Sequence, residues 1–174
     1  SACEKGGQWE RALQLLDEMQ QRGIEPNVIS FSAAISACEL SGEFTHAETL
    51  FLRSKQLFPN TDKLGESNMI DLHDLSAPVA RTVVRVALAD ARRRCCGDQE
   101  CEDLIIVTGR GKHSVDNEAV LRPAILAMFQ DQGEFHGVVE CKENVKNPGR
   151  VFVPGSSIQR WAQGEAGGPN PPRA

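Results

Sequence analysis

The sequence predicts an α+β protein, in which α-helical hairpin repeats of the solenoid type come first and a small α/β unit follows. Within the first 60 residues a four-letter motif recurs at an offset of 35 residues, and the apolar residues around it follow helical spacing. Further on, a helical segment separates two short apolar segments with strand character, which is the order of a βαβ unit.

The repeat is visible as the letters SACE at residues 1–4, which recur at residues 36–39. Apolar residues at i, i+3, i+4 and i+7 predict a buried helical stripe in each unit: Ala12, Leu15, Leu16 and Met19 in the first, and Phe31, Ala34, Ile35 and Cys38 in the second. The pairs at residues 6–7 and 41–42 are expected between helices, and Gly23 followed by Pro26 should end a helix. Each unit is therefore predicted to be a helical hairpin.

These units resemble the pentatricopeptide repeat family. The letters VISFS at residues 28–32 are similar to the family's opening motif, and GIEPN at residues 23–27 to its closing motif. The resemblance implies that each repeat reads one base of single-stranded RNA, with Ser32 paired to Asn60 or Asp62 in the second repeat. Alternatively, these are ordinary surface residues of a solenoid.

The chain is predicted to divide into four parts. Residues 1–60 hold one partial and one complete repeat, 61–67 a short linker, 68–162 the α/β domain, and 163–174 a disordered tail rich in Gly and Pro. Because a solenoid repeat buries its face on its neighbours, we expect this chain to be the C-terminal part of a longer array.

The predicted βαβ unit begins with a strand over 68–73, continues with a helix from Ser76 to Arg94, and ends with a strand over 104–107. Alternation in the first strand places Ile70 and Leu72 toward the core and Asp71 and His73 on the other face, about 6.5 Å apart. The continuous apolar run of the second strand predicts cover on both faces. Ser76 is the predicted helix cap.

The remainder of the domain is expected to add one helix and two strands. Leu121, Ile125, Met128 and Phe129 mark the helix. Residues 136–141 and 151–153 are the predicted strands, with a turn at 147–149, and Ile158 and Trp161 should lie on a last helical turn.

Parallel strands end at the same edge of a sheet, where open α/β sheets bind ligands. The pair Asp71 and His73 should therefore meet the glycine loop that follows the second strand. Two chemistries suit the pair: it binds a divalent metal, Mg²⁺ or Mn²⁺, or it acts as a carboxylate–imidazole acid/base pair. The alternative is an ordinary exposed polar pair at a strand end.

The glycine loop suits an anion, and phosphate is its expected guest, because glycines at a helix start let backbone N–H groups point inward. The predicted binding residues are Thr108, Gly109, Arg110, Gly111, Lys112 and His113. The alternative is a tight turn that needs glycine conformations.

Taken together, the order DLHDLS, helix, IVTGRGKHS, LRP and a terminal GRVFV closely resembles the Smr (small MutS-related) domain over residues 67–162. That resemblance implies a small α/β sandwich that binds nucleic acid, with endonuclease activity in some members. It implies catalytic roles for Asp71 and His73. Many members carry glycine where this chain has Asp74, and another glycine near residues 115–117; the extra carboxylate would either bind metal or repel phosphate.

The composition limits the classes of ligand that the protein is expected to bind. The net charge of −5 argues against a basic coat for nucleic acid but leaves room for a local patch. Six cysteines without a CxxC pair predict reduced thiols in a non-secretory setting, and the spacing of Cys95, Cys96 and Cys101 argues against zinc. No membrane, small-molecule substrate or organic cofactor is expected.

The two resemblances together imply an RNA-binding protein of chloroplast or mitochondrial RNA metabolism, in which the repeats supply sequence recognition and the Smr domain clamps or cuts RNA. Two alternatives stay open. One is a catalytically silent adaptor that docks RNA or a partner protein, and the other is a nuclease that acts on DNA.

Overall fold

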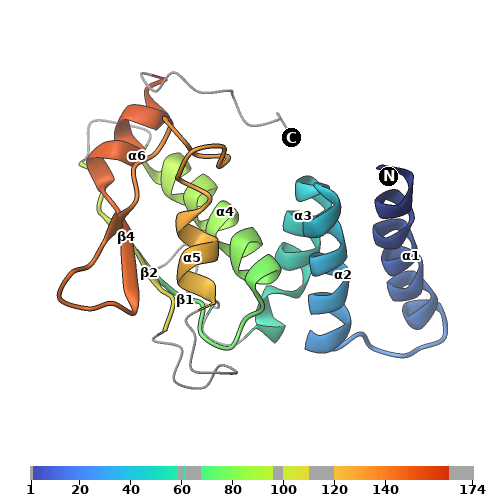
Figure 1. The fold of residues 1–174 in the computed structure, drawn as a ribbon. Helices are drawn as coiled ribbons and strands as arrows, with labels where there is room; N and C mark the ends of the chain where they lie inside the picture. The colour runs from blue at the N-terminus through green and yellow to red at the C-terminus, as the bar shows by residue number, and fades with distance from the viewer. Residues whose placement is uncertain (1, 59–60, 62–67, 96–99, 110–119, 165–174) are drawn as a thin grey trace.

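The computed structural model of the 174-residue chain describes residues 2–58, 61, 68–95, 100–109 and 120–164, without the side chains of residues 2–7. Its elements follow the predicted order of helical hairpins and then an α/β domain (Figure 1). The helical part consists of α1 (Ala2–Gln21), α2 (Val28–Ser41), α3 (Phe44–Ser54) and the short 3₁₀ turn η1 (Lys55–Leu57). The second part consists of β1 (Met69–Asp71), α4 (Ala77–Arg94), β2 (Leu104–Val107), α5 (Leu121–Leu126), β3 (Lys142–Glu143), β4 (Arg150–Val153) and α6 (Gly155–Ala162).

Local signals set the ends of the repeat helices. Gly23 ends α1 with φ +71° and Gly42 caps α2 with φ +81°, left-handed values that glycine adopts at little cost. Asn27 begins α2, because its Oδ1 accepts hydrogen bonds from the backbone N–H groups of Ile29 and Ser30 at 3.0 and 3.1 Å. The predicted break at residues 6–7 is wrong, since α1 runs through both glycines, whose cost of about 1 kcal/mol each does not by itself end a helix.

The sheet has the strand order β1-β2-β4-β3. β1 and β2 are parallel, with Asp71 opposite Val107, so the predicted βαβ crossover through α4 is confirmed. β4 pairs antiparallel with both β2 and β3. In β2, Leu104 and Ile106 are buried whereas Ile105 and Val107 are only partly buried, so the predicted full cover of both faces of this strand is wrong.

Helix α4 is the central element of the molecule and lies between the sheet and the repeat helices (Figure 1). Pro78 lies in the first turn of α4, where a backbone N–H would have no partner within the helix, so proline costs no hydrogen bond there. Ser76 occupies the cap position as predicted, but its side chain makes no capping hydrogen bond. Half of the helix is buried: Val79, Ala80, Thr82, Val83, Val84, Val86, Ala87, Leu88 and Ala91.

The C-terminal part departs most from the prediction. The expected strand at residues 136–141 is a series of turns, because Gly137 has φ +70° and both Val138 and Val139 are buried, which an alternating strand does not allow. β3 forms later, at Lys142–Glu143. α5 ends earlier than the predicted helix, whereas the last helical turn is extended to the two full turns of α6, with Ile158 fully buried.

Two further expectations concern the thiols and the segments between elements. Cys95 and Cys101 form a disulfide with their Cα atoms 5.4 Å apart, so the prediction of reduced thiols is wrong for this pair, which the end of α4 and the approach to β2 bring together. The predicted linker over 61–67 begins with Thr61, which is fully buried.

The rest of that linker, residues 62–67, and most of the predicted disordered tail, residues 165–174, lie outside the described part of the chain. No helix in the described part is long and apolar enough to cross a membrane.

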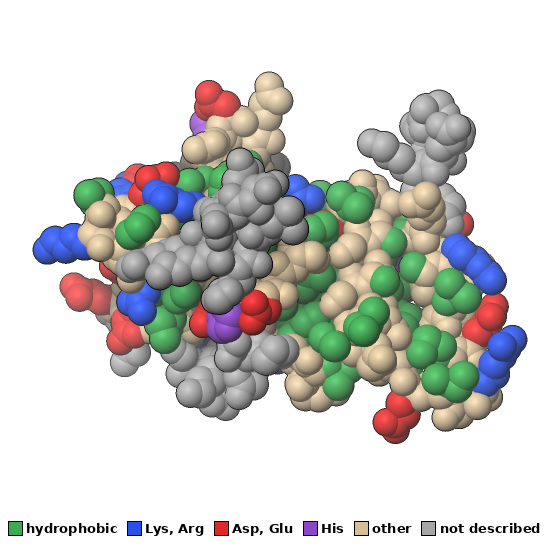
Figure 2. Space-filling view, turned by 60° about the horizontal axis from the view of Figure 1, so that its bottom comes forward, with side chains coloured by type: hydrophobic (Ala, Val, Ile, Leu, Met, Phe, Trp, Pro, Cys, Tyr) green, Lys and Arg blue, Asp and Glu red, His purple; other side chains and the backbone are tan. Residues whose placement is uncertain are grey.

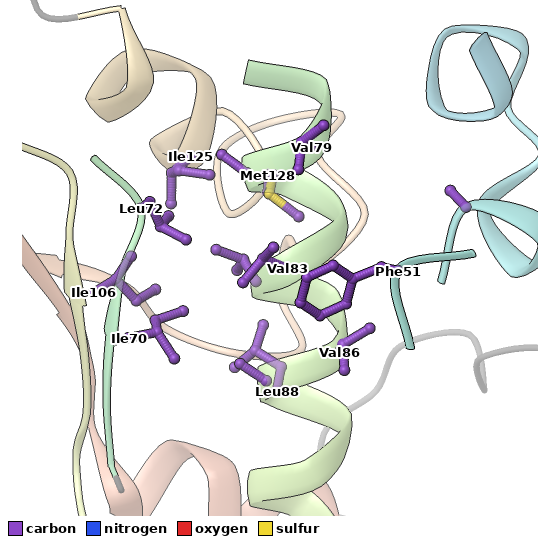
Figure 3. Packing of buried hydrophobic residues seen from close by; sticks show 14 of the residues in the cluster. Phe51, Ile70, Leu72, Val79, Val83, Val86, Leu88, Ile106, Ile125 and Met128 are labelled. Carbon is purple, nitrogen blue, oxygen red and sulfur yellow. The ribbon is translucent and has the colours of Figure 1, made fainter. Parts of the chain in front are cut away.

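The buried hydrophobic residues of both halves form one continuous cluster. Figure 3 shows its middle: Ile70 and Ile106 of the sheet approach α4 from one side and Phe51 of α3 from the other. Exposed large hydrophobic side chains concentrate on the repeat helices, where they colour much of one face in Figure 2.

Candidate nucleic-acid interface

The predicted pair at the end of β1 is joined in the structure. Asp71 is the last residue of the strand, and His73 lies in the turn that follows. The predicted strand over 68–73 is therefore too long, and the turn, not strand alternation, brings His73 to Asp71. Asp71 Oδ1 accepts a hydrogen bond from the backbone N–H of His73 at 3.1 Å and lies 2.7 Å from Nδ1 of its ring. The carboxylate therefore orients the imidazole and places the ring proton on Nδ1, which leaves Nε2 to face other groups.

The environment raises the pKa of His73 above its ordinary value of 6.5. The hydrogen bond from the ring to Asp71 is the main cause, and the negative charges of Asp71 and Asp74 act in the same direction, while partial burial opposes them. The imidazole thus keeps its positive charge to a higher pH than a free histidine, which favours contact with an anion.

Asp74 is the unusual member of this site. Its Oδ2 lies 3.3 Å from Nε2 of His73, so both ring nitrogens face carboxylates of the chain itself. Its backbone has φ +67°, in the left-handed region that favours glycine. This conformation gives a physical reason for glycine at this position in Smr-like sequences. Here a non-glycine residue adopts it and adds a negative charge beside the imidazole.

The start of the glycine loop lies against the same pair. Gly109 has φ +73°, and a Cβ placed on it would lie 3.9 Å from Cβ of His73. The parallel register of β1 and β2 brings these residues together, as the shared sheet edge predicted. A side chain at position 109 would be strained by this backbone conformation, and its Cβ would touch Cβ of His73 at an ordinary van der Waals distance.

Thr108 is buried and anchors the loop. Its backbone N–H donates to the carbonyl of Gly149 at 2.9 Å, and its hydroxyl donates to the same oxygen at 3.3 Å. The glycine loop is thereby tied to the turn between β3 and β4. The proposed contact of Thr108 with nucleic acid stays a prediction.

Arg122 is a residue to which the sequence assigned no role, although the LRP motif contains it. Its Nη1 donates to the carbonyl of Pro148 at 3.2 Å, and its Nη2 bonds the carboxylate of Glu143. Both partners belong to the β3–β4 hairpin, next to the carbonyl that holds Thr108. The LRP motif was the available signal, but the contacts of Arg122 join it to residues 21 and 26 positions away in the sequence.

We expect Arg122→Ala to loosen this hairpin and, through it, the start of the glycine loop. The loss of two partly exposed, charge-assisted hydrogen bonds should cost about 1 kcal/mol of stability. Amide hydrogen exchange at Thr108, whose N–H is held by the hairpin, should accelerate. Arg160→Ala, which removes an arginine paired to Glu140 at 2.9 Å, is the matched control, and equal acceleration in both variants would contradict the role of Arg122.

Several other predicted residues lie outside the described part of the chain: Arg110, Gly111, Lys112 and His113 of the loop, and Asn60 of the second repeat. Ser32 is half-buried on α2. Asn27, the residue at the end of the first repeat, uses its side-chain oxygen to cap α2. Base reading by Ser32 and Asn60 therefore remains a prediction from the repeat resemblance.

The described residues do not form a dedicated metal site. Among them no group of three or more Asp, Glu, His or Cys side chains converges as ligands would. Oδ1 of Asp71 is already engaged by the ring and backbone of His73. The nearby donors are the half-buried carboxylate of Asp71, the exposed carboxylate of Asp74 and the imidazole of His73, which contact each other.

Comparison with known proteins agrees with both halves of the fold. A family model of the PPR repeat family matches residues 1–39, and a model of the Smr domain matches residues 70–154. An Smr domain-containing protein of Schizosaccharomyces pombe is 31% identical over 113 residues, which are 64% of this chain and 22% of that protein. This chain thus spans about a fifth of the length of that relative.

No solved structure matches the chain. The matched segments coincide with the structural halves, since the repeat match covers α1 and most of α2, and the Smr match runs from β1 to the end of β4. Both domain types support nucleic acid as the ligand. The chain therefore combines a segment of the PPR repeat family, matched over residues 1–39, with an Smr domain, matched over residues 70–154.

Proposed function

We propose that this protein binds RNA and that its Smr domain cleaves the bound strand at the edge formed by the ends of β1 and β2. The observation that carries the proposal is the meeting of the Asp71–His73 pair with the glycine loop at Gly109. The repeats favour RNA over DNA as the ligand. By the same resemblance, we propose that the protein acts in a chloroplast or mitochondrion.

The geometry suggests a reaction that uses the 2′-hydroxyl of RNA. Asp71 holds the ring proton on Nδ1, so Nε2 of neutral His73 accepts the proton of a 2′-hydroxyl. The 2′-oxygen then bonds to the adjacent phosphorus, the bond from phosphorus to the 5′-oxygen breaks, and that oxygen takes a proton from water. The products are a 2′,3′-cyclic phosphate and a free 5′-hydroxyl, and the role proposed for the glycine loop is to bind the phosphate that reacts.

The test is cleavage of a labelled structured RNA by the full chain, with Mg²⁺, with Mn²⁺ and with EDTA. We expect cleavage that falls roughly 10²-fold or more in Asp71→Asn and His73→Ala, the range for loss of a general base. His136→Ala is the control, because His136 pairs with Asp131 at 3.0 Å in the turns after α5. Cleavage unchanged in both site variants would refute the assignment.

Substrates with a single 2′-deoxy nucleotide at the cut test the reaction itself. The 2′-hydroxyl route predicts that this substitution blocks cleavage and that DNA of the same sequence stays intact. Cleavage of the deoxy substrates would instead identify water as the nucleophile and a DNA-acting or general nuclease. Loss of all cleavage in EDTA would show that a divalent metal takes part.

The raised pKa of His73 predicts opposite pH dependences for binding and cleavage. The imidazolium attracts phosphate, so RNA affinity should fall as the pH rises through the raised pKa of His73, while cleavage should increase because neutral Nε2 is then available. In Asp71→Asn, which removes the main cause of the shift, the fall in affinity should move to lower pH. Fluorescence anisotropy of a labelled RNA, titrated with protein at several pH values between about 5.5 and 9, measures this affinity, and His136→Ala is the control.

One observation favours a second function, a clamp that binds RNA without cutting it. Nε2 of His73, the base of the proposed reaction, faces Asp74 at 3.3 Å. A phosphodiester must displace this carboxylate before it reaches the imidazole. RNA binding with normal salt dependence but without cleavage in any metal would establish the clamp.

A further inference from the structure

The joint between the repeats and the Smr domain contains a buried polar cluster that neither domain type explains by itself. Glu39 of α2 is only 3% exposed, although it is an ionisable residue. Its carboxylate accepts hydrogen bonds from the Thr82 hydroxyl at 3.1 Å and from Nη1 and Nη2 of Arg85 at 3.0 and 3.2 Å. Nε of Arg81 lies 3.0 Å away. All three partners come from α4 of the Smr domain.

Arg85 extends the cluster in the other direction. Its guanidinium also bonds the carboxylate of Glu134 at 2.9 Å and lies 4.3 Å from the centre of the Phe44 ring. Glu48 of α3 is 3.7 Å from its Nε. One arginine of the Smr domain is thus held by side chains of α2, α3 and the turns after α5.

Apolar packing surrounds this cluster. Phe51 of α3 is fully buried against α4, and Figure 3 shows its ring beside Val83 and Val86. The ring centre of Phe58 lies 5.6 Å from that of Phe51. Glu39 and Thr82 are buried beside this core, and the Arg85 side chain is only 12% exposed, so the charge of Glu39 depends on its partners. Arg81, Glu48 and Glu134 lie at the more exposed rim of the cluster.

The position of Glu39 in the repeat shows what α4 replaces. Glu39 stands 35 residues after Glu4, at the same place in the repeated motif. α4 packs against both helices of the α2–α3 hairpin, on the side away from α1 (Figure 1). In a solenoid the first helix of the next repeat would contact both helices of the preceding hairpin, because each repeat packs only on its neighbours.

We propose that α4 serves as the terminal capping helix of the repeat array and that the Glu39–Arg85 pair locks the Smr domain to the last repeat as one rigid body. Buried polar pairs of this kind specify one relative orientation of the parts they join, since any other orientation leaves a charge without its partner. The candidate site at Asp71 and His73 then keeps a constant distance from the repeats.

Resting on the proposed function, the joint has a consequence for RNA. A strand held by the repeats enters the Smr site at a fixed number of nucleotides from the sequence that the repeats bind. A flexible joint would instead spread the position of contact over several neighbouring nucleotides.

The first test needs no RNA. Spin labels on unnatural amino acids at Ile29 of α2 and Val145 of the β3–β4 turn report the distance between the domains; both positions are exposed, at 74% and 96%. The full chain should give one narrow distance distribution. Arg85→Gln should broaden it at least twofold, and Arg53→Gln, which changes an exposed arginine of α3, should leave it unchanged.

Glu39→Gln keeps the size of the side chain and its bond to Thr82 while removing the charge, so it provides a milder variant if Arg85→Gln fails to fold. The proposal would be overturned by a broad distance distribution in the unmodified chain. It would also be overturned if Arg85→Gln and Glu39→Gln both gave distributions as narrow as that of the unmodified chain.

The second test maps the edges of the RNA segment protected by the full chain. Edges that are sharp in the unmodified chain and in Arg53→Gln, but spread in Arg85→Gln, support the fixed spacing. Absence of any RNA protection, together with a narrow distance distribution, would refute the proposed function and leave the rigid joint standing. Sharp edges in Arg85→Gln would overturn the fixed spacing.

Discussion

Gly155→Ala is expected to destabilise the Smr domain by about 3 kcal/mol or more, the upper range for overpacking. Gly155 begins α6, and its N–H donates to Oδ1 of Asp103 at 2.8 Å. A Cβ at this position would lie 1.8 Å from the carbonyl oxygen of Cys101 and 2.5 Å from its carbon. These atoms are backbone, and Cys101 is tied to Cys95 by the disulfide, so the clash has no flexible side chain to relieve it.

Thermal unfolding followed by circular dichroism measures this effect. For a chain of this size, 3 kcal/mol corresponds to a fall in Tm of roughly 6–12 °C. Gly137→Ala is the matched control, because Gly137 has φ +70° but nothing within 4 Å of an added Cβ, so only backbone strain of about 1 kcal/mol is expected. Equal falls in Tm would show that the approach of Cys101 to α6 does not constrain the fold.

Asp74→Gly is expected to tighten RNA binding about fivefold at low salt. The Asp74 carboxylate lies beside Nε2 of His73, where the proposed function places a phosphate. Two unit charges 4 Å apart in a water-like medium interact by about 1 kcal/mol, which corresponds to this factor. The substitution also restores glycine to a backbone with φ +67°, so stability should change little.

Titration of labelled RNA at several salt concentrations measures the change. Two variants separate its causes. Asp131→Gly removes an exposed carboxylate elsewhere in the domain and controls for net charge. Gln132→Gly relieves another left-handed residue, with φ +68°, without a change of charge. Weaker RNA binding in Asp74→Gly would show that the carboxylate takes part in binding, as a ligand that brings in a cation.

Much of the fold could be predicted because its signals are local. Alternation in the predicted strand over 68–73 correctly placed Ile70 and Leu72 in the core, and the helical stripe from Phe31 to Cys38 is buried throughout. The other predicted stripe is buried only at Leu16, and the prediction is wrong for Leu15, which is 46% exposed because α1 packs mainly on α2 within the described part of the chain. The same reasoning failed at residues 136–141, where the apolar residues are adjacent rather than alternating. Composition alone does not distinguish a strand from buried turns in such a segment.

Part of the site was also predictable. A βαβ unit requires its two strands to be parallel, and this requirement brings Asp71 and His73 to Gly109. The contact of Asp74 with the ring was not predictable, because it depends on a left-handed backbone at a non-glycine residue. The role of Arg122 depends on a hairpin that forms later in the chain.

The sequence by itself determined the helical hairpins, the βαβ unit and the meeting of its two motifs at one sheet edge, since each follows from spacing within a short segment. Only the tertiary structure decided how the two halves join. Glu39 and Arg85 are 46 residues apart, and nothing in the repeat pattern or the helix pattern pairs them. Their contact arises because α4 must bury two opposite faces, one on the sheet and one on the last hairpin, and that shared burial sets the orientation of the repeats relative to the Smr domain.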